Sequence, residues 1–225
     1  MTSAPQVRGL LSALRHAPGG LLALRRFPAQ HCARILDLDA VTVSLQGAGK
    51  PELVWWPQST PGAVDMEDLQ YLLCEGPLID AATHVRPVLV ADLELEPQDR
   101  WPAFLAAPAP SSWPRSVAAL PLTAQGIPIG VLTGYHRQPG GLNTQRLTNL
   151  QALARTISTM AGGAPAAVPG LHRAVVHQAA GALADHEGMP LADAAKIVCA
   201  HLFATGQPLI DGSRALIAHP EAASP

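Results

Sequence analysis

Apolar and polar residues alternate over residues 40–45, Ala-Val-Thr-Val-Ser-Leu, which is the period of a half-buried β-strand. A glycine-containing turn at 47–49 separates this strand from the next apolar run. Similar short runs predict further strands at residues 52–56, 87–90, 116–122 and 127–135. The second of these, residues 87–90, is predicted as a short buried strand that begins at its proline.

Helical spacing appears between and after these strands. Residues 63–73 predict a short helix, and Gly76-Pro77 follows it as a break. Asn143 is placed to cap a second helix, whose apolar residues recur at a spacing of three to four through Ile157. Strands mixed with helices in this order predict one antiparallel-rich α+β domain.

The strand pattern ends at a stretch rich in glycine and proline, and three helical stripes follow at residues 171–186, 191–204 and 209–218. A bundle of about fifty residues is marginal alone, so we expect docking or dimerisation to stabilise it. The predicted organisation is an arginine-rich helical arm at 1–27, the α+β domain at 28–160, a linker at 161–169, an all-α three-helix bundle at 170–219 and a tail at 220–225.

The composition fits a folded chain without an obvious polyanionic partner. Hydrophobic residues make up 48% of the 225 residues and charged residues only 14%, which predicts a sizeable core, and the net charge is −2. Residues 1–36 hold five arginines and no acid, whereas residues 37–99 hold twelve acids. This asymmetry indicates either solvated arginines on an amphipathic helix pair or a basic arm that contacts a partner.

Side chains that could carry chemistry are scattered. The three cysteines form no CxxC pair and no two histidines are spaced i, i+4, so neither a metal site nor a cofactor is predicted. The acids from Asp92 to Asp99 resemble the start of a calcium loop but lack its glycine and its final glutamate, which favours a solvated loop. Cys74 is interpreted as a buried spectator, with a redox sensor as the alternative, and no enzyme is predicted.

No apolar run reaches the roughly 18 residues that span a bilayer, and Arg15-His16 interrupts the apolar N-terminal segment. We therefore expect a cytoplasmic protein that does not bind or span a membrane.

Four blocks resemble, in order, the central part of actinobacterial GAF sensor domains: residues 75–92, 100–104, 116–122 and 129–142. The resemblance implies an antiparallel sheet with helices on one side and a ligand pocket on the other, which would receive a small-molecule or protein signal. The residues that would line this pocket are Tyr71, Cys74, Ile79, Val90 and Trp101, and the same residues would also suit a plain core. Leu78 stands where the family block carries cysteine.

The C-terminal part resembles an ANTAR domain, a three-helix RNA-binding output module, in the blocks 177–181, 193–195 and 200–206. Together the two resemblances imply a dimeric signalling regulator that binds paired RNA stem-loops and prevents transcription termination. The RNA-binding residues would be Arg173, His177, Lys196 and Arg214 at phosphates and Gln178 at a base edge.

The C-terminal part also departs from this family, which leaves a second interpretation open. Cys199 replaces an arginine, Gly212-Ser213 replaces an apolar pair, and residues 165–225 carry a balance of −2. Because RNA binding depends on neutralising phosphates, the alternative is the same fold used for protein–protein contact or dimerisation. A methionine sulfoxide reductase would need clustered cysteines, and a DNA-binding helix would offer only Arg214.

Overall fold

The computed structural model describes residues 4–47, 49–108, 110, 112–162 and 171–224. It divides the chain into two compact units, Met1–Pro169 and Gly170–Pro225. Residues 163–169 of the expected linker lie outside the described residues.

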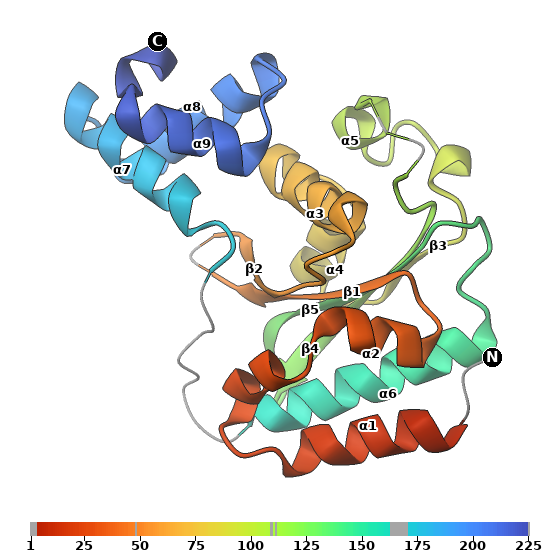
Figure 1. The fold of residues 1–225 in the computed structure, drawn as a ribbon. Coiled ribbons are helices and arrows are strands. Elements are labelled where there is room, and N and C mark those ends of the chain that lie inside the picture. The colour runs from red at the N-terminus through yellow and green to blue at the C-terminus, as the bar shows by residue number, and fades with distance from the viewer. Residues whose placement is uncertain (1–3, 48, 109, 111, 163–170, 225) are drawn as a thin grey trace. The chain divides into compact units, whose positions relative to one another are not determined.

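The first unit is built on a five-stranded antiparallel sheet with the order β2-β1-β5-β4-β3 (Figure 1). The strands are β1 (Ala40–Gln46), β2 (Pro51–Trp55), β3 (Val88–Val90), β4 (Ser116–Ala124) and β5 (Ile127–His136). All five expected strands are present, and the turn at Gln125-Gly126 joins the two longest, with both residues at positive φ. The predicted antiparallel α+β architecture is therefore confirmed.

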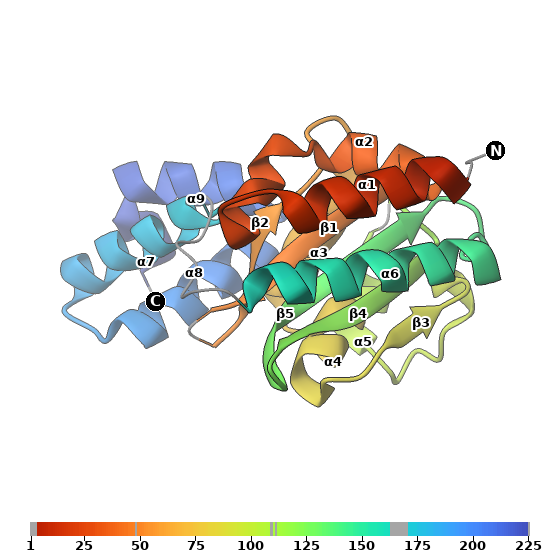
Figure 2. The same ribbon diagram turned by 90° about the horizontal axis from the view of Figure 1, so that it is seen from below.

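One face of the sheet is covered by helices from the two ends of this unit (Figure 2). They are α1 (Ala4–His16), the 3-10 helix η1 (Gly20–Arg26), α2 (Ala29–Leu36) and α6 (Thr144–Ala161). Asn143 caps α6 by accepting a hydrogen bond from the amide of Arg146, as its position predicts. Leu10 and Leu14 of α1 belong to the same apolar core as Leu153 of α6, so the N-terminal helix is part of the unit and not a separate arm.

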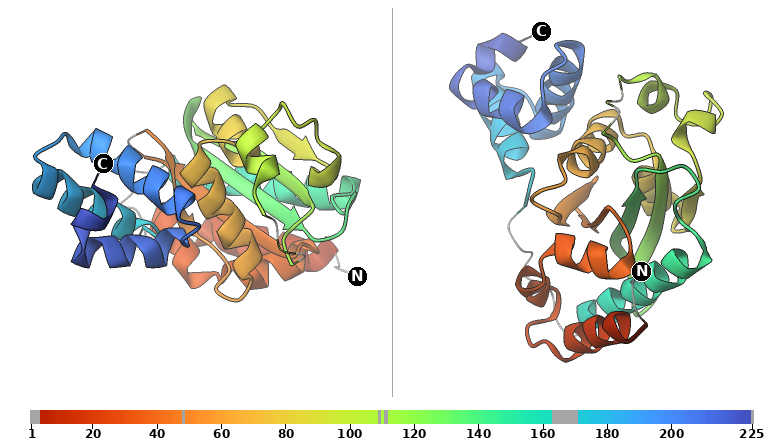
Figure 3. Two further views of the ribbon diagram at one scale, coloured as in Figure 1. Left: turned by 90° about the horizontal axis from the view of Figure 1, so that it is seen from above. Right: turned by 45° about the vertical axis from the view of Figure 1, so that its right-hand side comes forward.

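The opposite face carries α3 (Pro61–Leu73), α4 (Pro77–His84) and α5 (Pro102–Ala106), as the right-hand view of Figure 3 shows. Each of these helices begins at a proline, whose fixed φ suits the first helical position. Sequence reasoning treated Gly76-Pro77 as a break and did not predict α4 or α5. The break is the joint between α3 and α4, with Cys74 and Gly76 both at positive φ.

Strand β1 is buried on both faces, which differs from the half-buried strand that its alternation predicts. Its apolar residues Val41 and Val43 point to the core under α1, α2 and α6. Thr42 and Ser44 are also fully buried, because helix α3 covers the polar face and bonds to both hydroxyls. By contrast β3 is an edge strand, and its Leu89 is 51% exposed although a buried strand was expected there.

The second unit contains α7 (Ala174–Glu187), α8 (Leu191–Ala204), α9 (Leu209–Ala218) and the short 3-10 helix η3 (Pro220–Ala223). The helices lie where the apolar stripes predict, with Val198 and Leu202 of α8 fully buried. Gly212 lets α9 approach α8 closely, since a Cβ atom there would lie 2.4 Å from Cδ2 of Leu202. The Gly212-Ser213 pair therefore lies inside the unit, and both residues are buried.

Candidate ligand pocket

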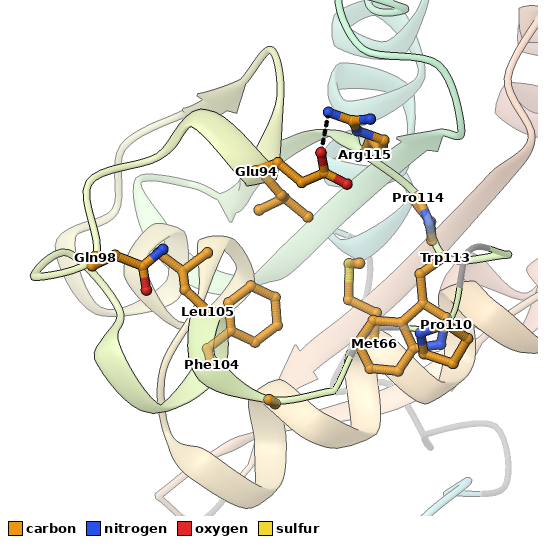
Figure 4. A pocket seen from close by; sticks show the side chains of 11 residues that line it. Met66, Glu94, Gln98, Phe104, Leu105, Pro110, Trp113, Pro114 and Arg115 are labelled. Carbon is orange, nitrogen blue, oxygen red and sulfur yellow. Dashed lines mark ion pairs between the residues drawn. The ribbon is translucent and has the colours of Figure 1, made fainter.

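A cavity of about 380 Å³ opens on the α3 and α5 side of the sheet (Figure 4). Its apolar wall is made by Met66 of α3, Phe104 and Leu105 of α5, Leu93, and Trp113, which precedes β4. Gln98, Glu94 and Arg115 bring polar atoms to the same cavity. An apolar hollow with a few polar groups at its edge is the usual form of a small-molecule site.

The short helix α5 is held in place by Glu75. Oε2 of this carboxylate accepts hydrogen bonds from the amides of Ala103 at 2.9 Å and Phe104 at 3.1 Å, two donors that the first turn of a helix leaves unpaired. Trp101 packs edge-on against Phe104 with ring centroids 6.2 Å apart. Glu75 therefore links the α3–α4 joint to the wall of the cavity.

The edge of the cavity carries an ion-pair cluster of one cation and two acids. Arg115 donates to both carboxylate oxygens of Asp92, from Nε at 2.9 Å and from Nη2 at 2.6 Å, and Nη2 also lies 2.7 Å from Oε2 of Glu94. The hydrogen bonds to Asp92 raise the pKa of Arg115 above its ordinary value, so the guanidinium stays charged. The amide of Leu93 donates to the carbonyl of Arg115 at 2.8 Å, which fixes this segment beside the start of β4.

Behind the cavity, α3 places a fully buried carboxylate against the sheet. Glu67 accepts hydrogen bonds from the hydroxyls of Thr42, Ser44 at 3.0 Å and Tyr135 at 2.8 Å. Burial, together with the nearby Glu67 carboxylate, raises the pKa of Tyr135 well above its ordinary value, so its hydroxyl remains a donor. Three hydroxyls therefore compensate one buried acid between a helix and the sheet.

A second cavity of about 270 Å³ lies near the β1–β2 turn, lined in part by Lys50, Cys74 and Ile79. Nζ of Lys50 donates to the carbonyl of Tyr71 at 3.0 Å and lies 4.7 Å from the centre of its ring. Two of the five expected ligand residues, Cys74 and Ile79, thus share a cavity that is not the larger one.

The other three expected ligand residues do not line either cavity. Tyr71, Val90 and Trp101 are at most 5% exposed, and Val90 and Trp101 belong to the apolar core on this face of the sheet. The structure does not bring the five residues together as one site. For these three it favours the alternative that the residues are core.

The expected RNA-binding residues of the second unit differ in accessibility. His177 and Gln178 are exposed on α7, whereas Arg173 is fully buried. Lys196 and Arg214 are exposed, and each pairs with an acid of its own helix, Lys196 with Asp193 at 3.0 Å and Arg214 with Asp211 at 2.8 Å.

The cysteines do not form a cluster. Cys32 lies in the core under α1 and α6, and Cys199 is buried in the second unit. The expectation that Cys74 is buried is wrong: it is exposed, because it ends α3 in the left-handed conformation. Within the described residues, no group of three or more His, Cys, Asp or Glu side chains could hold a metal ion. In the same part of the chain, no helix is both long enough and apolar enough to cross a membrane.

Sequence reasoning missed most of the larger cavity. Met66, Phe104 and Trp113 were not singled out, and Glu94 was interpreted as part of a solvated acidic loop. One signal was available: apolar and aromatic residues flank that acidic run on both sides, which is unusual for a loop fully surrounded by water.

Comparison with known proteins identifies the fold of the first unit. The family model for the GAF domain matches residues 21–160 and leaves 161–225 uncovered. The chain matches no curated protein.

Three solved structures illustrate the similarity. The GAF domain of a phosphoenolpyruvate-protein phosphotransferase from Coxiella burnetii is 16% identical with a TM-score of 0.51, over 69% of this chain and 90% of that one. A free methionine-R-sulfoxide reductase from Neisseria meningitidis, in complex with its substrate, is 17% identical with a TM-score of 0.50, over 72% and 92%. A putative GAF sensor protein from Burkholderia vietnamiensis is 19% identical with a TM-score of 0.50, over 70% and 94%. At these identities the similarity concerns the fold.

Proposed function

Because the chain belongs to the GAF domain family, we propose that its first unit senses a small molecule and that its second unit transmits the signal. The observation that carries the proposal is the 380 Å³ cavity between α3, α5 and the segment before β4. Its apolar wall and charged edge are suited to bind and orient a ligand. Helix α3 joins this cavity to the sheet, because Met66 lines the cavity and the adjacent Glu67 accepts a hydrogen bond from Tyr135 of β5.

The test is to measure intact mass under native conditions after purification and again after incubation with a metabolite extract. We expect a bound small molecule that is retained by the full chain and lost when Trp113 is replaced by alanine. Ile79→Ala, in the second cavity, is the matched control. Equal retention by both variants would contradict the assignment of the larger cavity.

For the output we propose RNA binding in transcription antitermination, supported by the order of ANTAR-like blocks along the second unit. The exposed side chains His177, Gln178, Lys196 and Arg214 are the contacts that this function would use. Full-length protein titrated with a paired stem-loop RNA at 50 and 200 mM salt tests it. Affinity that falls with salt, and falls further in the double variant Lys196→Gln with Arg214→Gln, supports RNA binding.

A protein–protein or dimerisation output is the second candidate, and one observation favours it. Both exposed cations of the expected RNA contacts are paired within their helices, and Arg173 is buried, so little positive charge remains for phosphates. This candidate predicts no RNA binding at either salt concentration and a dimeric mass for the wild-type chain. Phe203 is an exposed apolar residue, and Phe203→Asp is expected to reduce that mass to the monomeric value. A monomeric mass in the wild-type chain would contradict dimerisation.

The structures of similar fold include a methionine sulfoxide reductase, so an enzymatic role for this unit is a further hypothesis to test. The described cysteines lie apart, with Cys32 and Cys74 on different sides of the first unit. We propose that this chain does not catalyse that reaction. Reduction of free methionine sulfoxide by the purified chain, lost in Cys74→Ser, would overturn this statement.

A further inference from the structure

We propose that the 380 Å³ cavity binds an organic cation, a molecule with a flat apolar body and one ammonium group. This inference rests on the proposed sensing function and names the class of its ligand.

The wall of the cavity selects the body of the ligand. Phe104 and Trp113 provide aromatic surface, and Met66 and Leu105 provide aliphatic surface around it. A volume of about 380 Å³ exceeds that of a bicyclic aromatic ring and lies at the small end of ligand pockets. Aromatic faces also attract positive charge, and this attraction is strongest for tryptophan.

The edge of the cavity selects the head of the ligand. Among the described residues that line the cavity, Glu94 and Arg115 are the charged ones. Asp92 engages Arg115 through both oxygens, and its side chain is only 10% exposed, so this pair is fixed and neutral. Glu94 is therefore the surplus charge, and the cluster of two acids and one guanidinium carries a balance of −1.

Glu94 is also the most exposed member of the cluster, with 69% of its side chain exposed. Its carboxylate lies over the cavity in Figure 4, next to Arg115. An ammonium group on the ligand could pair with this carboxylate while the carboxylate of Asp92 balances the charge of Arg115. An anionic head would have to displace Glu94 from Arg115 and then lie beside a carboxylate of the same sign, which costs free energy.

Three probes with one indole body separate the possibilities: tryptamine as the cation, indole-3-acetate as the anion and tryptophol as the neutral alcohol. Saturation-transfer NMR with the full chain reports binding of each at millimolar concentration. We expect tryptamine to bind about three- to fivefold more tightly than tryptophol, the range for a partly exposed ion pair, and indole-3-acetate to bind most weakly.

Two variants assign the preference to named side chains. Glu94→Gln is expected to remove the three- to fivefold advantage of tryptamine while leaving tryptophol unchanged. Glu96→Gln is the matched control, because Glu96 belongs to the same acidic run but pairs with Arg100 at 2.5 Å and does not line the cavity. Trp113→Ala is expected to weaken all three probes.

Each outcome decides the inference. Tighter binding of indole-3-acetate than tryptamine, equal binding of all three probes or binding of none would overturn the cationic class. The first two of these results would leave the sensing function standing, because a ligand still occupies the cavity. The native mass measurement described above tests the sensing function separately, whatever the charge of the ligand.

Discussion

The two faces of the sheet are built from neighbouring positions of the same strands and are both covered by helices, yet they differ in chemistry. Under α1, α2 and α6 the strands present apolar side chains such as Val43, Leu120 and Leu132. Under α3, α4 and α5 the neighbouring positions of the same strands present Thr42, Ser44 and Tyr135, which bond to Glu67. One face is a scaffold held by packing, and the other holds a satisfied polar cluster next to a cavity.

This difference explains how far the sequence could be interpreted. Alternation along residues 40–45 identified the strand correctly, but the assumption that polar means exposed placed Thr42 and Ser44 in water. The acid that covers them, Glu67, is 23 or more residues further along the chain, so no local pattern reveals the pairing. The helices at α3 and α6 were predictable from apolar spacing and from the Asn143 cap.

The cavity was harder to predict for the same reason. Its wall combines Met66, Phe104 and Trp113 from three segments, and only the fold brings them together. The resemblance to a family placed the expected pocket on the face of the sheet that carries this cavity, but the residues it named include Val90 and Trp101, which lie in the apolar core. A residue's place in a motif does not say whether its side chain faces a cavity or the interior.

The largest expected effect tests the polar face. Glu67→Ala leaves three buried hydroxyls without their acceptor. An unpaired buried group costs about 1–3 kcal/mol, and the costs of neighbouring groups do not add in full. We therefore expect the free energy of unfolding to fall by about 4 kcal/mol. Urea denaturation measures it. Glu67→Gln keeps one acceptor oxygen and is expected to lose less than half as much. Equal losses for the two variants would show that the hydroxyls do not depend on Glu67.

A substitution that removes a packed side chain from the apolar face is expected to lower the free energy of unfolding somewhat less. Leu153 of α6 is fully buried in that core, and Leu153→Ala should lower the free energy of unfolding by about 3 kcal/mol. Tryptamine binding to the folded variant should be unchanged, because the substitution lies on the other side of the sheet from the cavity. A large change in binding would mean that the two faces are not independent.

Alkaline pH distinguishes the faces through one buried group on each. Burial raises the pKa of Cys32 from 9.0 to about 12 on the apolar face, and burial beside Glu67 raises that of Tyr135 on the polar face. Because both pKa values are higher in the folded chain, stability is fully present below about pH 9 and falls as the pH rises. The slope is up to about 1.4 kcal/mol per pH unit for each group above its unfolded pKa.

Denaturation at pH 8 and 10.5 measures this loss. Cys32→Ala and Tyr135→Phe should each flatten the dependence, and the double variant should flatten it most. An unchanged pH profile in both single variants would contradict the assignment to these groups.

The smallest expected change in stability comes from two threonines that are direct neighbours across β1 and β5, Thr42 and Thr133. The hydroxyl of Thr42 donates to Glu67, whereas Oγ1 of Thr133 is buried and has no hydrogen-bond partner among the described residues. We expect Thr42→Val to cost about 1–2 kcal/mol and Thr133→Val to be neutral or slightly stabilising. A reversed order would contradict the described polar cluster.

The most direct test of a sensing face is to map where a ligand binds. Amide chemical shifts of the full chain, recorded with and without tryptamine, report this for both faces at once. We expect shifts concentrated at Leu93, Glu94, Phe104 and Trp113, with the amides of Leu150 and Leu153 unmoved. Shifts confined to α1 and α6, or to the second cavity around Ile79, would contradict the assignment of the sensing site.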